Sequence, residues 1–542
     1  TLSGNSAKTP NRPTAAMDVE EFRKHGKDMV DYICDYMKSL QERQVIPDVQ
    51  PGYLRLSLPA IPPEQPEAWE SIMKDVEDHV MRGVTHWQHP RFHAYFPAGN
   101  AYPSIMGGML GDALGIVGFS WAASPACAEL EMLVLDWLAK MTHMPHHFQH
   151  ESGLGGGVMQ GSASDSILVT MLAARRDKLN QIKREHANDF EEGKFLSRLV
   201  AYCSKLAHSC VEKAGMISCI QVHQLDYHPD YLGLQGRTLQ LAIEEDRRNG
   251  LIPFFVCAVL GTTACASCDD LESITQVCQR EGLWCHVDAA YAGSAFICEE
   301  LTYFLRGVEV SRRNVDSYNF NPNKWMLINF DCSVLWVRDK EKLTSSMIVD
   351  PVYLQHKHSS NVVDFRHWGI PLSRRFRSLK VWFVIRSYGV EGLRRYIRNH
   401  CMLAKLFESQ VKRDNRFELV GQVHFGLVCF RWKDSNALTQ YLIRQINDSG
   451  KLHMIPATVK GQYIIRFALC SEHAKEEDVF YAWNVIKTHA DEISTTIKTL
   501  NMWTKQAFRN SITKEVDIEQ EEDVGDAGEG GDGGEESGSA GG

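Results

Sequence analysis

Apolar residues recur at helical spacing near the start of the chain. Seven of them between Phe22 and Leu40 fall on one helical face, which predicts an amphipathic helix over residues 18–42. Six prolines between Pro47 and Pro66 then favour an extended segment, which gives this face little to pack against. We therefore expect residues 17–100 to form a helical and extended segment that packs on a second subunit. An ordinary linker within the chain is the alternative.

From about residue 101 to residue 390, short apolar runs alternate with amphipathic segments. This alternation is typical of an α/β domain whose mostly parallel sheet is covered by helices on both faces, with ligands bound beyond the carboxyl ends of the strands. Residues 391–500 predict a smaller α+β domain. The predicted strands are residues 199–202, 253–260, 283–287, 427–432 and 463–468, and the predicted helices include residues 207–215 and 271–281.

Charge is concentrated at the end of the chain. Eleven acidic and no basic residues follow Lys514, so the rest of the chain carries about +1 of the net charge of −10. The glycine-rich acidic segment 515–542 and the polar leader 1–16 are expected to be disordered. A nearly neutral body predicts no nucleic-acid partner, and no apolar run reaches the ~18 residues needed to cross a membrane.

Fifteen cysteines are an odd number, and most lie inside apolar runs. Free cysteine behaves there as a small hydrophobic residue, so we expect a reduced, cytoplasmic protein without disulfides. No signal-peptide pattern stands at the start of the sequence. His86, His89 and His93 lack a zinc-protease spacing, and the Cys265–Cys268 pair has no second pair, so no metal site is predicted.

One carboxylate and one amine suit a pyridoxal phosphate (PLP) site. The predicted strand 283–287 ends on Asp288, and Lys324 follows thirty-six residues later beside Trp325. A lysine among apolar neighbours has a lowered pKa and can form a Schiff base with PLP, while an aspartate keeps the pyridine nitrogen protonated. A strand-capping aspartate and an unrelated lysine are the alternative.

Three further groups could surround this pair. The glycine-rich run from Gly155 to Ser164 precedes a helical segment and could bind a phosphate through free N–H groups, although a simple turn is the alternative. His208 follows a predicted strand, where its ring could stack on a cofactor or could be structural. Thr263 follows the predicted strand 253–260, which places its hydroxyl near the same edge of the sheet. A turn would also favour a threonine at this position.

Aromatic residues and a long polar segment complete the candidates. Trp87, Tyr95 and Phe96 could line a pocket for a planar side chain or could simply pack in the core. Residues 350–368 predict a long loop, which could be a lid that brings Tyr353 to the site or a surface loop without a role.

These segments together resemble the PLP-dependent group II amino-acid decarboxylases over residues 17–490. The resemblance is carried by HPRFHAYFPAGN, GSAS, AHSCVEKAG, LGTT, HVDAAYAG, NPNKW, DPVYL and PLSRRFRSLK. Within the family the chain is most similar to the invertebrate tyrosine decarboxylase branch. The resemblance implies the aspartate aminotransferase-type fold (fold type I), PLP as cofactor and a homodimer.

The resemblance also implies a role for each matching residue. Lys324 binds PLP covalently, Asp288 pairs with the pyridine nitrogen, His208 stacks on the ring, and Tyr353 protonates Cα after CO₂ leaves. Phosphate and cofactor contacts fall to Ala163, Ser164, Asn321 and Thr263. The substrate pocket is implied to comprise Trp87, Tyr95, Phe96 and Ala98, with Val117 and Phe119 from the neighbouring subunit.

Two positions depart from the family pattern. Asn323 replaces the histidine that many relatives carry before the lysine, and Ser373 replaces the glycine common in dopa-selective relatives, a serine that histidine decarboxylases share. The expected reaction is decarboxylation of L-tyrosine to tyramine. The alternatives are a dopa, 5-hydroxytryptophan or histidine decarboxylase, a decarboxylating aromatic aldehyde synthase, and an inactive dimeric binding protein with an acidic tail.

Overall fold

The computed structural model describes residues 17–308, 315–348 and 363–522, with side chains as far as residue 500. It forms two compact units, one ending at Trp483 and the other beginning at Asn484. Helix α15 (Glu476–Glu522) crosses this boundary, so residues 515–522 are helical where the sequence favoured disorder. Residues 1–16 and 523–542 lie outside the described part. No helix in the described ranges is long and apolar enough to cross a membrane.

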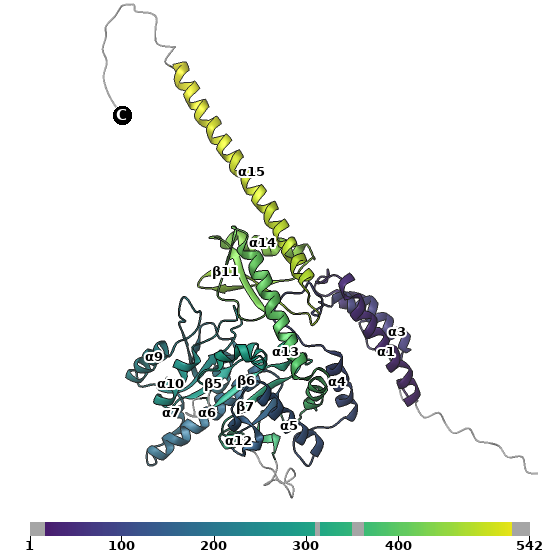
Figure 1. Ribbon diagram of the computed structural model, residues 1–542, viewed down its shortest axis with the longest axis vertical. Coiled ribbons are helices and arrows are strands. Elements are labelled where there is room, and N and C mark those ends of the chain that lie inside the picture. The colour runs from purple at the N-terminus through teal and green to yellow at the C-terminus, as the bar shows by residue number, and fades with distance from the viewer. Residues whose placement is uncertain (1–16, 309–314, 349–362, 523–542) are drawn as a thin grey trace, which may run out of the picture. The chain divides into compact units, whose positions relative to one another are not determined.

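A seven-stranded sheet forms the centre of the first unit (Figure 1). Its strands run parallel except β7, which is antiparallel to both neighbours, and this confirms the predicted mostly parallel sheet. In spatial order the strands are β1 (Gly156–Gln160), β7 (Ser333–Val337), β6 (Ser317–Phe320), β5 (Trp284–Asp288), β4 (Ile252–Val259), β2 (Leu199–Ser204) and β3 (Gln221–Leu225).

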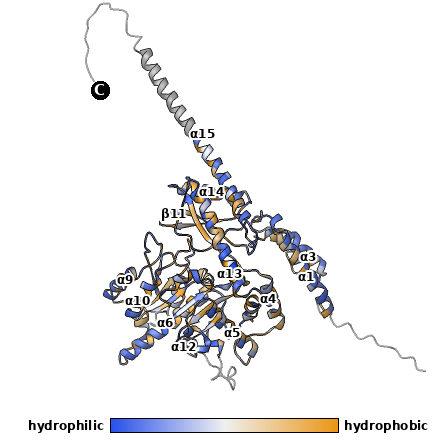
Figure 2. Cartoon of the chain, in the orientation of Figure 1, coloured by the Kyte–Doolittle hydropathy of each residue, from blue (hydrophilic) through white to orange (hydrophobic). Residues whose placement is uncertain are grey.

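Helices cover both faces of this sheet, because most strands are apolar on both sides. One face packs against α6 (Ala163–Glu185), α8 (Cys210–Ser218) and α12 (Lys340–Met347). The other packs against α5 (Pro125–Met141), α9 (Gly236–Arg248), α10 (Leu271–Glu281) and α13 (Arg377–Lys412). Surface helices such as α9 are largely hydrophilic, whereas the strands are mostly hydrophobic (Figure 2).

Several predicted boundaries agree closely with the structure, and one does not. Helix α10 has the predicted bounds, but α8 begins at Cys210 rather than at residue 207. The side chains of Ser204 and His208 each accept a hydrogen bond from the backbone N–H two residues later. Such local bonds favour a turn over a helix, so His208 lies in a loop before α8.

A smaller antiparallel sheet lies within residues 391–500. Its order is β10 (Ile455–Val459), β11 (Gln462–Ala468), β9 (Leu427–Trp432) and β8 (Phe417–Leu419), with α14 (Asn436–Asp448) packed against β9 and β11. The strand predicted at residues 427–432 has the predicted bounds, and β11 begins one residue before its prediction.

The segment before the large sheet is mostly helical. Helix α1 (Val19–Ser39) begins at a capping box, in which Asp18 accepts from Glu20 and Glu21 and Glu21 accepts in return. This confirms the helix predicted from residue 18. The remaining helices are α2 (Tyr53–Ser57), α3 (Trp69–Asp75), α4 (Tyr102–Leu114) and, later in the chain, α7 (Glu192–Leu196) and α11 (Pro322–Trp325).

Candidate active site

A cavity of about 210 Å³ lies beyond the carboxyl ends of the parallel strands. It collects side chains that are far apart in the sequence, since parallel strands end at the same edge of the sheet. Eight residues singled out from the sequence line it: Phe96, Ala163, Ser164, His208, Thr263, Asp288, Asn321 and Lys324. The structure therefore brings the predicted cofactor residues to one place.

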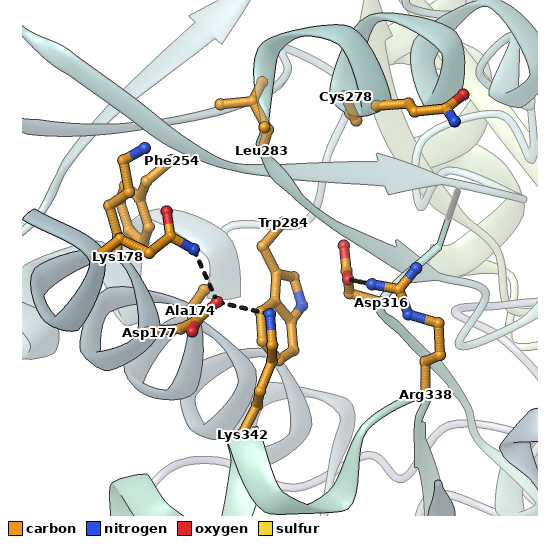
Figure 3. Close-up of a pocket in the computed structure, with 13 residues that line it drawn as sticks. Ala174, Asp177, Lys178, Phe254, Cys278, Leu283, Trp284, Asp316, Arg338 and Lys342 are labelled. Carbon is orange, nitrogen blue, oxygen red and sulfur yellow. Dashed lines mark hydrogen bonds and ion pairs between the residues drawn. The ribbon is translucent and has the colours of Figure 1, made fainter. Parts of the chain in front are cut away.

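A larger cavity of about 310 Å³ lies near the amino ends of β5 and β6 and does not include these residues (Figure 3). Its charged side chains are largely paired with each other. Lys342 donates to Asp177 at 2.8 Å, and Arg338 pairs with Asp316. Size alone therefore does not identify the functional site in this fold.

Lys324 lies on α11, a single turn between β6 and β7. Its backbone N–H donates to the Asn321 carbonyl at 2.9 Å, and the Asn323 side chain accepts the Cys332 N–H at 3.1 Å. Asn323 thus anchors the turn and does not line the cavity. Burial lowers the pKa of Lys324, and the charge of Asp288 partly opposes this shift.

An aromatic stack forms the wall beside the lysine. The ring of Phe96 lies 4.0 Å from that of Tyr291, and Tyr291 lies 4.7 Å from Trp325. The Lys324 amine is 5.4 Å from the centre of the Phe96 ring. The stack holds the lysine-bearing turn against the segment that contains Phe96.

Asp288 is the last residue of β5 and is 4% exposed. Its Oδ1 accepts from the Ala290 N–H at 3.0 Å and from Asn319 Nδ2 at 3.1 Å. Both bonds end on Oδ1, so Oδ2 can accept a hydrogen bond from a ligand. This geometry suits a partner for a protonated ring nitrogen.

His208 accepts the Cys210 backbone N–H on Nδ1 at 3.1 Å. Burial, followed by the charge of Lys324, lowers the pKa of His208 and favours the neutral ring. A neutral imidazole that accepts on Nδ1 carries its proton on Nε2. His208 therefore presents an N–H donor on its other ring nitrogen.

The start of α6 suits a phosphate. Ser162 caps this 23-residue helix by accepting the Asp165 N–H, and Ala163 and Ser164 supply the first helical N–H groups. Asn321 faces the same cavity, and its Oδ1 is buried without a hydrogen-bond partner in the described part of the chain. The NH₂ group of this amide, and not its oxygen, is what can donate to a phosphate beside the helix N-terminus. These residues fit PLP.

The remaining predicted residues do not line this cavity in a single chain. Trp87 and Tyr95 are exposed and stack on each other at 5.0 Å. Ala98 uses its carbonyl to accept from Gln88, and Ser373 borders a separate cavity. The other three are Val117 and Phe119, which lie in the loop after α4, and Tyr353, which lies outside the described residues.

Two residues near the site were not identified from the sequence. Arg466 on β11 is 2% exposed, donates to the Tyr95 carbonyl at 3.0 Å, and lies 4.9 Å from the Phe96 ring. Cys210 lines the cavity together with Ser164, and burial raises the pKa of its thiol. Arg466 could have been found from the sequence, because it is a single arginine inside the apolar run that forms β11.

All fifteen cysteines are free. Within residues 17–308, 315–348 and 363–500, no group of three or more His, Cys, Asp or Glu side chains is arranged to hold a metal ion.

Known proteins are similar to this chain over most of its length. Residues 51–433 match the family described as "Pyridoxal-dependent decarboxylase conserved domain". Histidine decarboxylase of Homo sapiens is 50% identical over 476 residues, which cover 88% of this chain and 71% of that protein. Aromatic-L-amino-acid decarboxylase of Mus musculus is 48% identical over 480 residues, which cover 88% of this chain and 99% of that protein.

Solved structures show the same fold. Oryza sativa TDC with PLP and tryptamine superposes with a TM-score of 0.84 at 36% identity, over 89% of this chain and 99% of that one. Rhodiola rosea 4-hydroxyphenylacetaldehyde synthase gives a TM-score of 0.82 at 36% identity, over 88% of this chain and 100% of that one.

Proposed function

Because the chain belongs to the pyridoxal-dependent decarboxylase family, we propose that it converts L-tyrosine to tyramine and CO₂. Family membership assigns PLP as the cofactor and decarboxylation of an aromatic amino acid or histidine as the reaction. The observation that carries this assignment is the cavity in which Lys324 and Asp288 face one ligand space. Tyrosine as the preferred substrate rests on the resemblance of the sequence to the tyrosine decarboxylase branch and on the aromatic wall at Phe96.

The residues of this cavity divide the work of binding the cofactor. Lys324 would hold PLP covalently, Asp288 would accept the ring N–H, and the start of α6 with Asn321 would hold the phosphate. When bound, PLP supplies an electron sink for the bond between Cα and the departing carboxylate. His208 would cover the ring and present its Nε2–H to the substrate.

Two further residues would contribute to the reaction. Arg466 is a buried cation beside the Phe96 ring, and, after burial, its charge helps to lower the pKa of Lys324. Arg466 does not line the cavity, so it would act by favouring the neutral amine of Lys324. Tyr353, which lies outside the described residues, would deliver a proton to Cα after CO₂ has left.

A homodimer would complete the site. Helix α1 is amphipathic yet has no buried residue in one chain, and α4 exposes Met106, Met109 and Leu114. Exposed apolar surface of this kind marks an interface. We propose that the partner subunit covers these helices and that Val117 and Phe119 of each chain enter the neighbouring site. The free cysteines support a cytoplasmic location.

Covalent cofactor binding is tested with purified protein and added PLP. Lys324→Ala should lose both the absorbance of covalently bound cofactor and turnover. The matched control is Lys178→Ala, a lysine whose pKa burial also lowers but which borders the other cavity. It should keep both. Retention of covalently bound PLP by Lys324→Ala would contradict the assignment.

Substrate and product are tested together. Competing kcat/KM values for tyrosine, dopa, tryptophan and histidine should rank tyrosine first and histidine last. Identity does not decide this, because a histidine decarboxylase is among the similar proteins. Amine without peroxide is expected, since the sequence contains both His208 and Tyr353. Stoichiometric aldehyde and peroxide would instead identify an aldehyde synthase.

A further inference from the structure

Five buried polar side chains line one face of β5 and β6. Successive side chains of a strand alternate between faces, so Trp284, His286 and Asp288 share a face of β5. The parallel register pairs His286 with Ser317 and Asp288 with Asn319 on β6. None of the five is more than 6% exposed.

Hydrogen bonds join these side chains into one chain. Trp284 Nε1 donates to Ser317 Oγ at 2.8 Å, and Ser317 Oγ lies 2.8 Å from His286 Nδ1. His286 Nε2 lies 2.7 Å from Asn319 Oδ1, and Asn319 Nδ2 donates to Asp288 Oδ1 at 3.1 Å. We call this set the β5–β6 relay. It runs from the edge of the cavity in Figure 3, which Trp284 lines, to the candidate active site.

The chemistry of the end groups sets the direction of every bond. A carboxylate only accepts, so Asn319 turns its NH₂ to Asp288 and its oxygen to His286. His286 must then carry its proton on Nε2. Burial lowers the pKa of His286 to about 4, so the ring is neutral near pH 7 and Nδ1 accepts from the Ser317 hydroxyl.

The other end of the relay agrees with this assignment. The indole N–H of Trp284 can only donate, and the Ser317 oxygen can accept it while its own proton points to His286. All four bonds therefore donate toward Asp288. Chains of aligned hydrogen bonds polarise one another in a low-dielectric interior, which strengthens the last donor.

We propose that the β5–β6 relay is a positioning device for the Asp288 carboxylate. It fixes Asn319 with its NH₂ toward Oδ1 and leaves Oδ2 available to accept the ring N–H that bound PLP would present. Ser317, His286 and Asn319 are thus positioning residues that act through Asp288. The proposal rests on the proposed role of Asp288 as the partner of the PLP ring.

The first test measures the PLP dissociation constant of the apoprotein. Asn319→Leu removes the last donor and should weaken PLP binding about tenfold, Ser317→Ala about threefold, and Trp284→Phe less than about twofold. The control is Ser294→Ala, a fully buried serine whose hydroxyl has no partner in the described residues. It should bind PLP as the wild type does.

The kinetic signature separates positioning from general damage. Ser317→Ala at saturating PLP should lower kcat while the KM for the amino acid stays unchanged, because the relay contacts no substrate. Its apoprotein should unfold at a lower Tm than Ser294→Ala, because the buried Trp284 N–H and His286 Nδ1 lose their partner, so the kinetics are compared at a temperature well below both Tm values. The proposal would be overturned if Ser317→Ala had the same PLP affinity and kcat as Ser294→Ala. It would also be overturned if Trp284→Phe weakened PLP binding more than Asn319→Leu does.

A second test reads the proton itself in the apoprotein. With ¹⁵N-labelled histidine, the signals lost in His286→Gln identify this ring, and they should show a proton on Nε2 and none on Nδ1. A proton on Nδ1 would reverse the relay and refute it. Asp288→Ala separates the proposed role of Asp288 from the relay. Full PLP affinity in Asp288→Ala would refute the role of Asp288. Lost PLP affinity in Asp288→Ala, with unchanged affinity in Ser317→Ala, would refute the relay alone.

Discussion

Replacing Arg374 by methionine should destabilise the first unit by about 3–5 kcal/mol, because it leaves a buried carboxylate without its counter-charge. Arg374 is 7% exposed and pairs with Glu131, which is fully buried on α5. The guanidinium also donates to the Met159 carbonyl at 3.1 Å and lies 4.4 Å from the Phe365 ring. One side chain therefore joins α5, β1 and the segment before α13.

A second substitution separates the charge from the packing. Glu131 Oε1 also accepts the Met159 N–H at 2.9 Å, and glutamine can still accept this bond. Arg374→Met combined with Glu131→Gln should therefore recover stability to within about 1–2 kcal/mol of the wild type. The control is Arg375→Met, because Arg375 is exposed and its 3.9 Å pair with Asp112 should contribute less than about 1 kcal/mol.

The assay is thermal unfolding at fixed protein and PLP concentrations, since bound cofactor shifts Tm. Arg374→Met should lower Tm by roughly 5 °C or more, and the double variant should regain most of this loss. The backbone carbonyl of Arg374 also accepts the Gly118 N–H at 2.9 Å, and this bond does not depend on the arginine side chain. A double variant no more stable than Arg374→Met would refute the unpaired-charge explanation.

Three other outcomes are expected. Because the pKa of Lys324 is lowered, its amine is neutral at a lower pH than the amine of an ordinary lysine. The rate of PLP association with the apoprotein should therefore rise with pH through a midpoint below 10.5. Stopped-flow absorbance measures this rate, and a midpoint at or above 10.5 would contradict the prediction. Gly99→Ala places a Cβ 2.4 Å from the Ile328 carbonyl oxygen. The substitution should lower the free energy of unfolding by about 1–3 kcal/mol and raise KM by displacing the segment that contains Phe96. Gly193→Ala, whose Cβ meets no atom within 4 Å, should have neither effect in the same unfolding and kinetic assays. Met109→Asp on the exposed face of α4 should dissociate the proposed dimer and reduce activity, as sedimentation read beside turnover would show; an intact dimer would place the interface elsewhere.

Much of the fold follows from local patterns. Helix α10 and strand β9 have the bounds that apolar spacing predicts, because side-chain periodicity depends only on neighbouring residues. Asp288 and Lys324 stand out for a related reason: a strand end and a lysine beside apolar runs are visible without the fold. The start of α8 was misplaced because the competing side-chain bonds of Ser204 and His208 do not appear in hydrophobic spacing.

The sequence by itself determined five of the strands, several helices and the chemical groups available for catalysis, since these depend on residue type and short-range spacing. Only the tertiary structure decided which groups meet. It placed Arg466 beside Phe96, turned Trp87 to the surface of a single chain, and paired β5 with β6 in the register that aligns the relay on Asp288. Strand order and register arise from packing between distant segments, and such long-range contacts have no signature in a local pattern.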